Sequence, residues 1–158
     1  MKMGALVGAL ALSAVGCSDD DGDAANPLGG AATPSAPDNV EDLVNTLYGA
    51  LADNDASTAC ALFSPSGQVE FIEGHDMPTC EAAVDSIAQA ITDAEAFAHP
   101  TIELDDPNAT EVDEYCGSGI SVRVPDGAGD GVIAAFGYSQ QPDGTWLVTS
   151  YSTSSCGG

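Results

Sequence analysis

The sequence contains very few basic side chains. Lys and Arg together number 2, against 25 Asp and Glu, and the formal net charge is −23. Proteins that bind nucleic acid need basic groups to replace the counterions of phosphates, and Arg123 and Lys2 are the only Lys or Arg residues here. We therefore expect no nucleic-acid partner. Docking of so acidic a surface on anionic lipid is also unfavourable.

The N-terminal apolar run is too short to cross a bilayer. It extends from Ala5 to Val15, whereas a transmembrane helix needs about 20 residues. Lys2 precedes the run, and the run ends in the small residues Ser13 and Ala14, followed by Val15 and Gly16 directly before Cys17. A positive start, a short apolar core and small residues before a cleavage site are the layout of a secretory signal peptide.

Residues 12–17 (LSAVGC) resemble the lipobox of bacterial lipoproteins. The resemblance implies that residues 1–16 are a signal peptide and that Cys17 carries diacylglycerol as the first mature residue. Two acyl chains are enough to anchor a protein stably. The membrane is then a partner through the lipid anchor. The expected location is the outer face of the cell membrane, or the outer membrane in a host that has one.

The rest of the chain divides into a linker and one domain. Residues 18–37 are acidic and rich in Gly, Ala and Pro, with almost no large apolar side chains. Such a segment cannot offset its own ordering entropy, so we expect residues 17–37 to be a disordered linker that begins with the lipidated Cys17. Residues 38–158 have the common size of a single domain.

The cysteine count indicates an oxidising compartment. With Cys17 used for lipid, Cys60, Cys80, Cys116 and Cys156 remain, an even number that suits two disulfides. Four cysteines allow three pairings. We favour Cys60–Cys80 and Cys116–Cys156, because each pairs neighbours within one half of the domain. No C-x-x-C pair exists and the spacings differ from those of structural zinc sites. We expect no metal site and no cofactor.

Apolar residues in the first half of the domain follow a helical period. Residues 40–51 carry one continuous apolar stripe, and Asp38 is expected to cap that helix. A short second helix is expected to pass through residues 60–63, and residues 64–67 are expected to end it. Thr79 is expected to cap a third helix.

After Pro100 the apolar period changes to two, which is typical of strands. Short turns between the runs make neighbouring strands antiparallel. We therefore predict an α+β fold in which N-terminal helices pack on a curved antiparallel sheet of about four strands. The four runs are residues 102–104, 120–124, 132–138 and 146–148.

This order of elements resembles the nuclear transport factor 2-like cone, and in particular the small lipoproteins of that family in actinobacteria. The resemblance rests on element order, on residues 43–48 (LVNTLY), on residues 59–64 (ACALFS) and on the strand that contains Trp146. It implies helices over one face of a curved sheet, with a pocket between them. A cystatin-like sheet wrapped on a helix is the alternative.

No catalytic motif is present, so we assign no catalytic residue. His75 and Asp76 are adjacent, and His99 stands apart from them, but the chain contains no G-x-S-x-G sequence. Enzymes of the cone family use pocket carboxylates, Tyr or His. Six residues of this chain could line such a pocket: Tyr48, Asp113, Glu114, Tyr115, Tyr138 and Tyr151.

Three functions fit the sequence. We favour a non-enzymatic binding or accessory domain for a small apolar ligand or an envelope partner. One alternative is an isomerase- or hydrolase-like enzyme, and another is a surface spacer without a ligand. An apolar pocket would favour binding, whereas converging polar side chains at a deep opening would favour catalysis.

Overall fold

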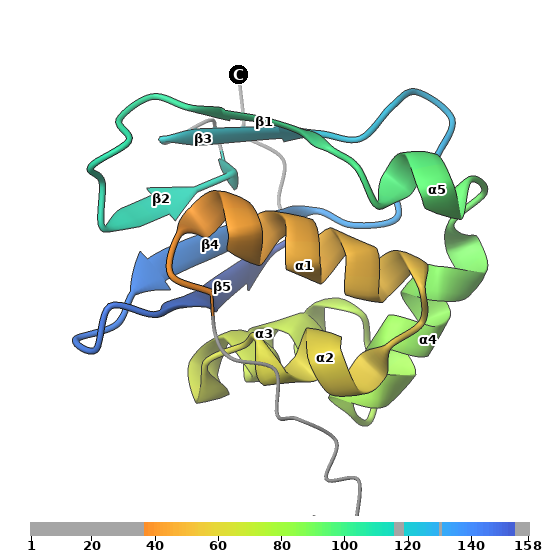
Figure 1. Cartoon of the computed structure of the whole chain (residues 1–158). Coiled ribbons are helices and arrows are strands. Elements are labelled where there is room, and N and C mark those ends of the chain that lie inside the picture. Colours follow the sequence, from red (N-terminus) through yellow and green to blue (C-terminus); the bar gives the residue numbers. More distant parts are fainter. Residues whose placement is uncertain (1–36, 116–118, 130, 154–158) are drawn as a thin grey trace, which may run out of the picture. The chain divides into compact units, whose positions relative to one another are not determined.

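The computed structural model describes residues 37–115, 119–129 and 131–153. Within these residues the helices come first and the strands follow (Figure 1), so the predicted α+β class is confirmed. The helices are α1 (Val40–Ala52), α2 (Ala56–Ala61), α3 (Pro65–Gly74), α4 (Cys80–Ala90) and α5 (Ala94–Phe97). The strands are β1 (Thr101–Leu104), β2 (Glu111–Asp113), β3 (Ile120–Arg123), β4 (Ala135–Gln140) and β5 (Trp146–Ser152).

The strands form two antiparallel sheets, instead of the single sheet of about four strands that the sequence predicts. Among the described residues, β1 pairs with β3, and β4 lies between β2 and β5. The additional strand is β2, whose three residues are too short to show a period of two. Figure 1 shows α1 beside β4 and β5, with β1 and β3 along another side of the helix.

Side chains cap the start of every helix that the structure describes. The α1 cap is Asn39, whose side chain accepts a hydrogen bond from the Asp42 N–H at 2.8 Å. The expected cap Asp38 is therefore wrong by one residue. Thr79 caps α4 as predicted. Such a cap contributes about 1 kcal/mol by satisfying an N–H that has no partner within the helix.

Residues 64–67 begin a helix, which corrects the expectation that they only end one. Ser64 accepts a hydrogen bond from the Gly67 N–H at 3.1 Å, and Pro65 occupies the first turn of α3. Pro is favoured there because its missing N–H would have no helical partner. The Ser64 N–H also donates to the carbonyl of Val148 on β5. These bonds hold the start of α3 against the sheet.

Aromatic side chains fill the space between the helices and the three-stranded sheet. Phe71 of α3 contacts Phe63, Phe136 and Tyr151, with ring centroids 4.7 to 6.1 Å apart. Phe71 and Phe136 are fully buried. Aromatic pairs at such distances contribute beyond the area that they bury. In this structure, the interior side of β4 is packed with rings.

A disulfide joins α2 to α4. Cys60 and Cys80 are bonded with their Cα atoms 6.0 Å apart, which confirms that half of the predicted pairing. Cys17, Cys116 and Cys156 lie outside the described residues, so the lipidation and the second pair stay predictions. Across the described part of the chain, no helix is both long and apolar enough to pass through a membrane.

Candidate functional site

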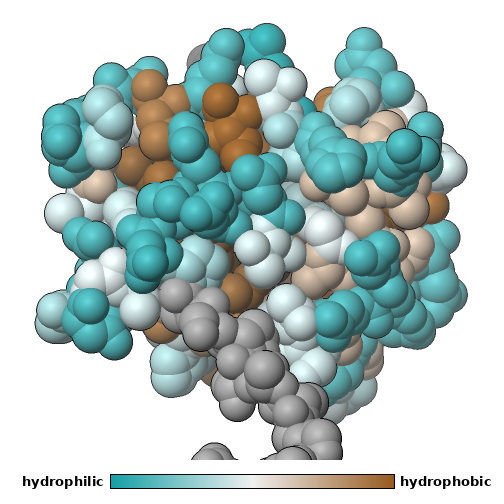
Figure 2. All heavy atoms as spheres, viewed as in Figure 1, coloured by the Kyte–Doolittle hydropathy of each residue, from teal (hydrophilic) through white to brown (hydrophobic). Residues whose placement is uncertain are grey.

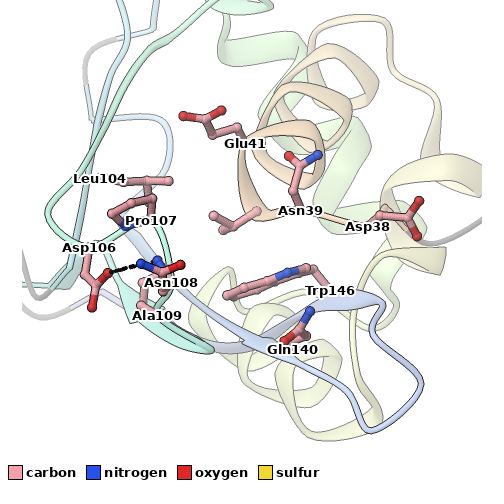
Figure 3. A pocket seen from close by; sticks show the side chains of 12 residues that line it. Asp38, Asn39, Glu41, Leu104, Asp106, Pro107, Asn108, Ala109, Gln140 and Trp146 are labelled. Carbon is pink, nitrogen blue, oxygen red and sulfur yellow. Dashed lines mark hydrogen bonds between the residues drawn. The ribbon is translucent and has the colours of Figure 1, made fainter.

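A cleft of about 370 Å³ opens where α1 begins (Figure 3). Cavities that hold small ligands have volumes of roughly 300–1,000 Å³. The cleft brings together the start of α1, the loop after β1, and residues of β2, β4 and β5. Its lining consists of Asp38, Asn39, Val40, Glu41, Leu104, Asp106, Pro107, Asn108, Ala109, Val112, Gln140 and Trp146.

The base of the cleft is apolar. Val40, Val112 and Trp146 are buried, with Trp146 only 5% exposed. Figure 3 shows the indole ring of Trp146 crossing the cleft between Asn39 and Gln140. The backbone N–H of Trp146 donates to the Pro37 carbonyl at 2.8 Å. The cleft therefore lies beside Pro37, the first of the described residues.

The rim of the cleft is acidic. Asp38, Glu41 and Asp106 are exposed, and Figure 3 shows them at separate places around the opening. The Asn108 N–H donates to Asp106 Oδ1 at 2.9 Å, which holds the turn after β1 in place. Figure 2 shows hydrophilic residues around small groups of hydrophobic ones on the visible face of the molecule.

The described residues do not form a metal centre. No group of three or more His, Cys, Asp or Glu side chains among them could hold a metal ion. His75 and His99 lie at different places: His75 follows α3, and His99 lines a second cleft beside α5. The rim carboxylates of the first cleft are thus arranged around an opening and do not converge on one point.

A second polar cluster lies inside the domain, around Glu114. The Tyr138 hydroxyl donates to Glu114 Oε1, and the Tyr48 hydroxyl approaches Oε2 at 3.5 Å. The Glu114 N–H donates to the Phe136 carbonyl at 2.9 Å, which orients the residue toward β4. Tyr48 is 2% exposed and Tyr138 is 0% exposed. The carboxyl group therefore points into the aromatic core.

Burial dominates the acid–base properties of this cluster. It raises the pKa of Glu114 to about 7, although the hydrogen bonds from Tyr138 and Tyr48 act in the opposite direction. Burial also raises the pKa values of both tyrosines well above their usual range. Near neutral pH, Glu114 is accordingly divided between its protonated and ionised forms.

His75 and Tyr151 form a further pair beside the same core. The Tyr151 hydroxyl lies 2.9 Å from His75 Nε2 and accepts a hydrogen bond from the Ala134 N–H at 3.3 Å. Burial lowers the pKa of His75, which favours the neutral ring. In the tautomer whose Nε2 carries no proton, this nitrogen accepts a hydrogen bond from the Tyr151 hydroxyl. His75 is therefore held by packing and one hydrogen bond, while the adjacent Asp76 is exposed.

The structure joins some of the sequence candidates and separates others. Tyr48, Glu114 and Tyr138 meet inside the packed core, and none of them lines the cleft around Trp146. Asp113 acts on this cluster through its charge, which helps to raise the pKa of Glu114. Its Oδ1 accepts a hydrogen bond from the Tyr115 N–H at 2.5 Å. Sequence reasoning did not identify the cleft around Trp146. Its signals were the turn at residues 106–108 and the only Trp of the chain, which become neighbours only in the fold.

Comparisons with known proteins identify no relative. No protein-family model matches the chain, and no curated protein or solved structure matches it significantly.

Proposed function

We propose that the protein is a lipid-anchored extracytoplasmic lipoprotein whose folded domain is a non-enzymatic binding module. The observation that supports binding best is the open cleft with Trp146 at its apolar base and polar groups at its rim. Ligand sites commonly combine an apolar lining with a few placed polar groups. A small ligand or a side chain of an envelope partner would occupy the cleft.

Two features support the location. Residues 12–17 resemble a lipobox and follow Lys2 and an apolar run. The Cys60–Cys80 disulfide is consistent with a compartment outside the cytoplasm, because cytosolic thiols are kept reduced. Together they favour export followed by anchoring through Cys17.

The anchoring is tested by Cys17→Ala in a bacterial host. We expect the variant to accumulate as unprocessed precursor or to leave the membrane fraction, whereas Ser18→Ala, next to the site, stays anchored. Labelling with a radioactive fatty acid should mark the wild type and Ser18→Ala only. Unchanged processing and labelling of Cys17→Ala would rule out the lipid anchor.

The binding function is tested with Trp146 as reporter. It is the only Trp of the chain, so a change in its fluorescence reports on this cleft. We expect saturable changes with a subset of small ligands, and the same subset should lose affinity when Leu104→Ala removes part of the apolar lining of the cleft. A screen in which nothing changes Trp146 fluorescence would favour the spacer alternative.

A cone-like arrangement is the fold that we propose beyond the α+β class. Its support is the position of α1 and α3 beside β4 and β5, with aromatic rings between them. The interior that a cone would leave open is here filled by residues such as Phe97 and Tyr138. An experimental structure would test the proposal through the continuity of β3 with the three-stranded sheet.

Proton-transfer catalysis is the second candidate function, and Glu114 is the observation that favours it. A carboxyl group with a pKa of about 7 and two tyrosine partners has the properties of a general acid or base. Tyr48 and Tyr138 are closed off by the core, however, and Glu114 does not line the cleft around Trp146. Binding is therefore the function that the geometry supports better.

A further inference from the structure

The charges around the cleft are all of one sign. Asp38, Glu41 and Asp106 line it, and all three are exposed. Arg123, the single Lys or Arg among the described residues, does not line it. An occupant with positive charge would gain attraction from several sides, and an anion would be repelled.

The base of the cleft contributes a hydrogen-bond donor without a partner. Trp146 lines the cleft, and its side chain is only 5% exposed. Among the described residues, no hydrogen bond of its indole N–H is found, and the nitrogen is not sealed from solvent. A ligand that covers this N–H without accepting from it leaves a buried donor unsatisfied, which is costly. The occupant therefore needs an acceptor oxygen.

The arrangement of the carboxylates excludes a single ion as occupant. They stand at separate places around the opening, and no group of three acidic side chains in the described residues could hold a metal. An elongated organic cation can reach the rim while its body covers the base. A linear polyamine lacks the acceptor that Trp146 requires. A Lys or Arg residue has both groups, because its amide carbonyl accepts and its side chain carries the charge.

We propose that the cleft binds a Lys or Arg residue. The amide carbonyl accepts from the Trp146 indole N–H, the aliphatic stem lies over Val40 and Leu104, and the ammonium or guanidinium group reaches the carboxylates of the rim. Long basic side chains cover apolar surface with their stems in this way while the charged end stays in water. This inference rests on the proposed binding function and names the chemistry of the ligand.

The probe is Nα-acetyl-lysine N-methylamide, compared with the same derivative of norleucine, which has the stem but no charge. Titration of the full chain should change Trp146 fluorescence saturably with the lysine derivative, and salt should weaken that binding. Glu41→Gln and Asp106→Asn should each weaken it about twofold to fivefold, the range of exposed ion pairs. Glu73→Gln removes the same charge from an exposed position of α3, away from the cleft, and should leave the affinity for the lysine derivative unchanged.

Two further probes identify the source of the residue. Binding of free lysine as tightly as the derivative would indicate a small-molecule ligand, and tighter binding of an extended capped Gly-Lys-Gly peptide would indicate a segment of a protein. Equal effects of Glu73→Gln and Glu41→Gln would overturn the proposal, because bulk charge alone would explain them. Binding of the norleucine derivative alone would overturn the cation but retain the binding module. If no probe changes Trp146 fluorescence, the Lys or Arg ligand is overturned, whereas the binding module is decided by the wider screen of small ligands.

Discussion

The hydroxyl of Tyr138, in the middle of β4, donates a hydrogen bond to the carboxylate of Glu114, just after β2. This contact places an ionisable group against the fully buried part of the central strand. Because β2 and β4 are paired, the bond also ties the edge strand to the core. The protonation state of one side chain is thereby coupled to the stability of the sheet.

Glu114 should make stability depend on pH. The pKa of Glu114 is about 7 in the folded chain, against 4.5 for a glutamate side chain exposed to water. A carboxyl group whose pKa is higher in the folded chain than in the unfolded chain stabilises the fold at pH values below its unfolded pKa. This stabilisation is lost as the pH rises through the folded pKa. Between pH 4.5 and 7 the loss should approach about 3 kcal/mol. Urea unfolding of the wild type and Glu114→Gln measures it.

The Glu114→Gln variant shows whether titration of Glu114 raises or lowers the stability of the fold. Gln keeps an oxygen that can accept from Tyr138 but does not titrate. The difference in unfolding free energy, wild type minus Glu114→Gln, should therefore fall as the pH rises from 5 to 8. Other acidic groups contribute equally to both proteins and cancel. A difference that stays constant over this range would show that Glu114 titrates normally.

Removing each tyrosine hydroxyl in turn should show how much each of the two partners of Glu114 contributes to stability. At pH 8, Tyr138→Phe should cost about 1.5–3 kcal/mol, the value of a hydrogen bond to a charged group. Tyr48→Phe should cost less, because its hydroxyl lies 3.5 Å from the carboxylate, at the limit of a hydrogen bond. Both substitutions keep the ring in place. Equal costs in urea unfolding would contradict this ranking.

Local sequence predicted the elements whose signals are local. The stripe across residues 40–51 repeats over three turns, so α1 was predictable, and Thr79 marked α4. Helix α3 was missed because Pro65 reads as a stop, and only Gly67 and Phe71 of this helix are buried. Its position depends on backbone bonds to Val148, which is distant in sequence. Such a partner cannot be seen in a short window.

Contacts between segments that are distant in sequence also explain why the candidate site could be predicted only in part. Tyr48, Glu114 and Tyr138 are candidates by sequence because the resembled family uses pocket carboxylates and tyrosines, but their hydrogen bonds require the pairing of β2 with β4. The cleft depends on a turn at residues 106–108 meeting Trp146. Each segment alone has the features of an ordinary turn or strand, so no sequence period indicates that the two form one opening.

Loss of the Cys60–Cys80 disulfide should destabilise the domain without changing its fold. The bond closes a loop with a sequence separation of 20 residues, and loops of this size contribute about 3 kcal/mol in the chain-entropy model. We expect the double variant Cys60→Ala/Cys80→Ala to lose this amount in urea unfolding. The far-ultraviolet circular dichroism spectrum should stay the same. Non-reducing peptide mapping of the wild type should recover the pair, and a crossed pairing would contradict the structure.

Two glycines in helices should respond to alanine with opposite signs. At Gly49 in α1 an added Cβ meets nothing within 4 Å, whereas at Gly67 in α3 it would lie 2.6 Å from the Val148 carbonyl oxygen. Alanine is favoured over glycine in a helix by about 0.5–1 kcal/mol. Gly49→Ala should therefore stabilise the domain by up to that amount.

Gly67→Ala carries the same helical advantage but forces α3 away from β5. The atom that blocks the new Cβ belongs to the backbone, and it also accepts the hydrogen bond from the Ser64 N–H. Overpacking of this kind typically costs about 1–3 kcal/mol, so the variant should be destabilised despite its better propensity. The comparison with Gly49→Ala in urea unfolding isolates the clash from the propensity. If both variants gain stability, α3 does not approach β5 as closely as the structure places it.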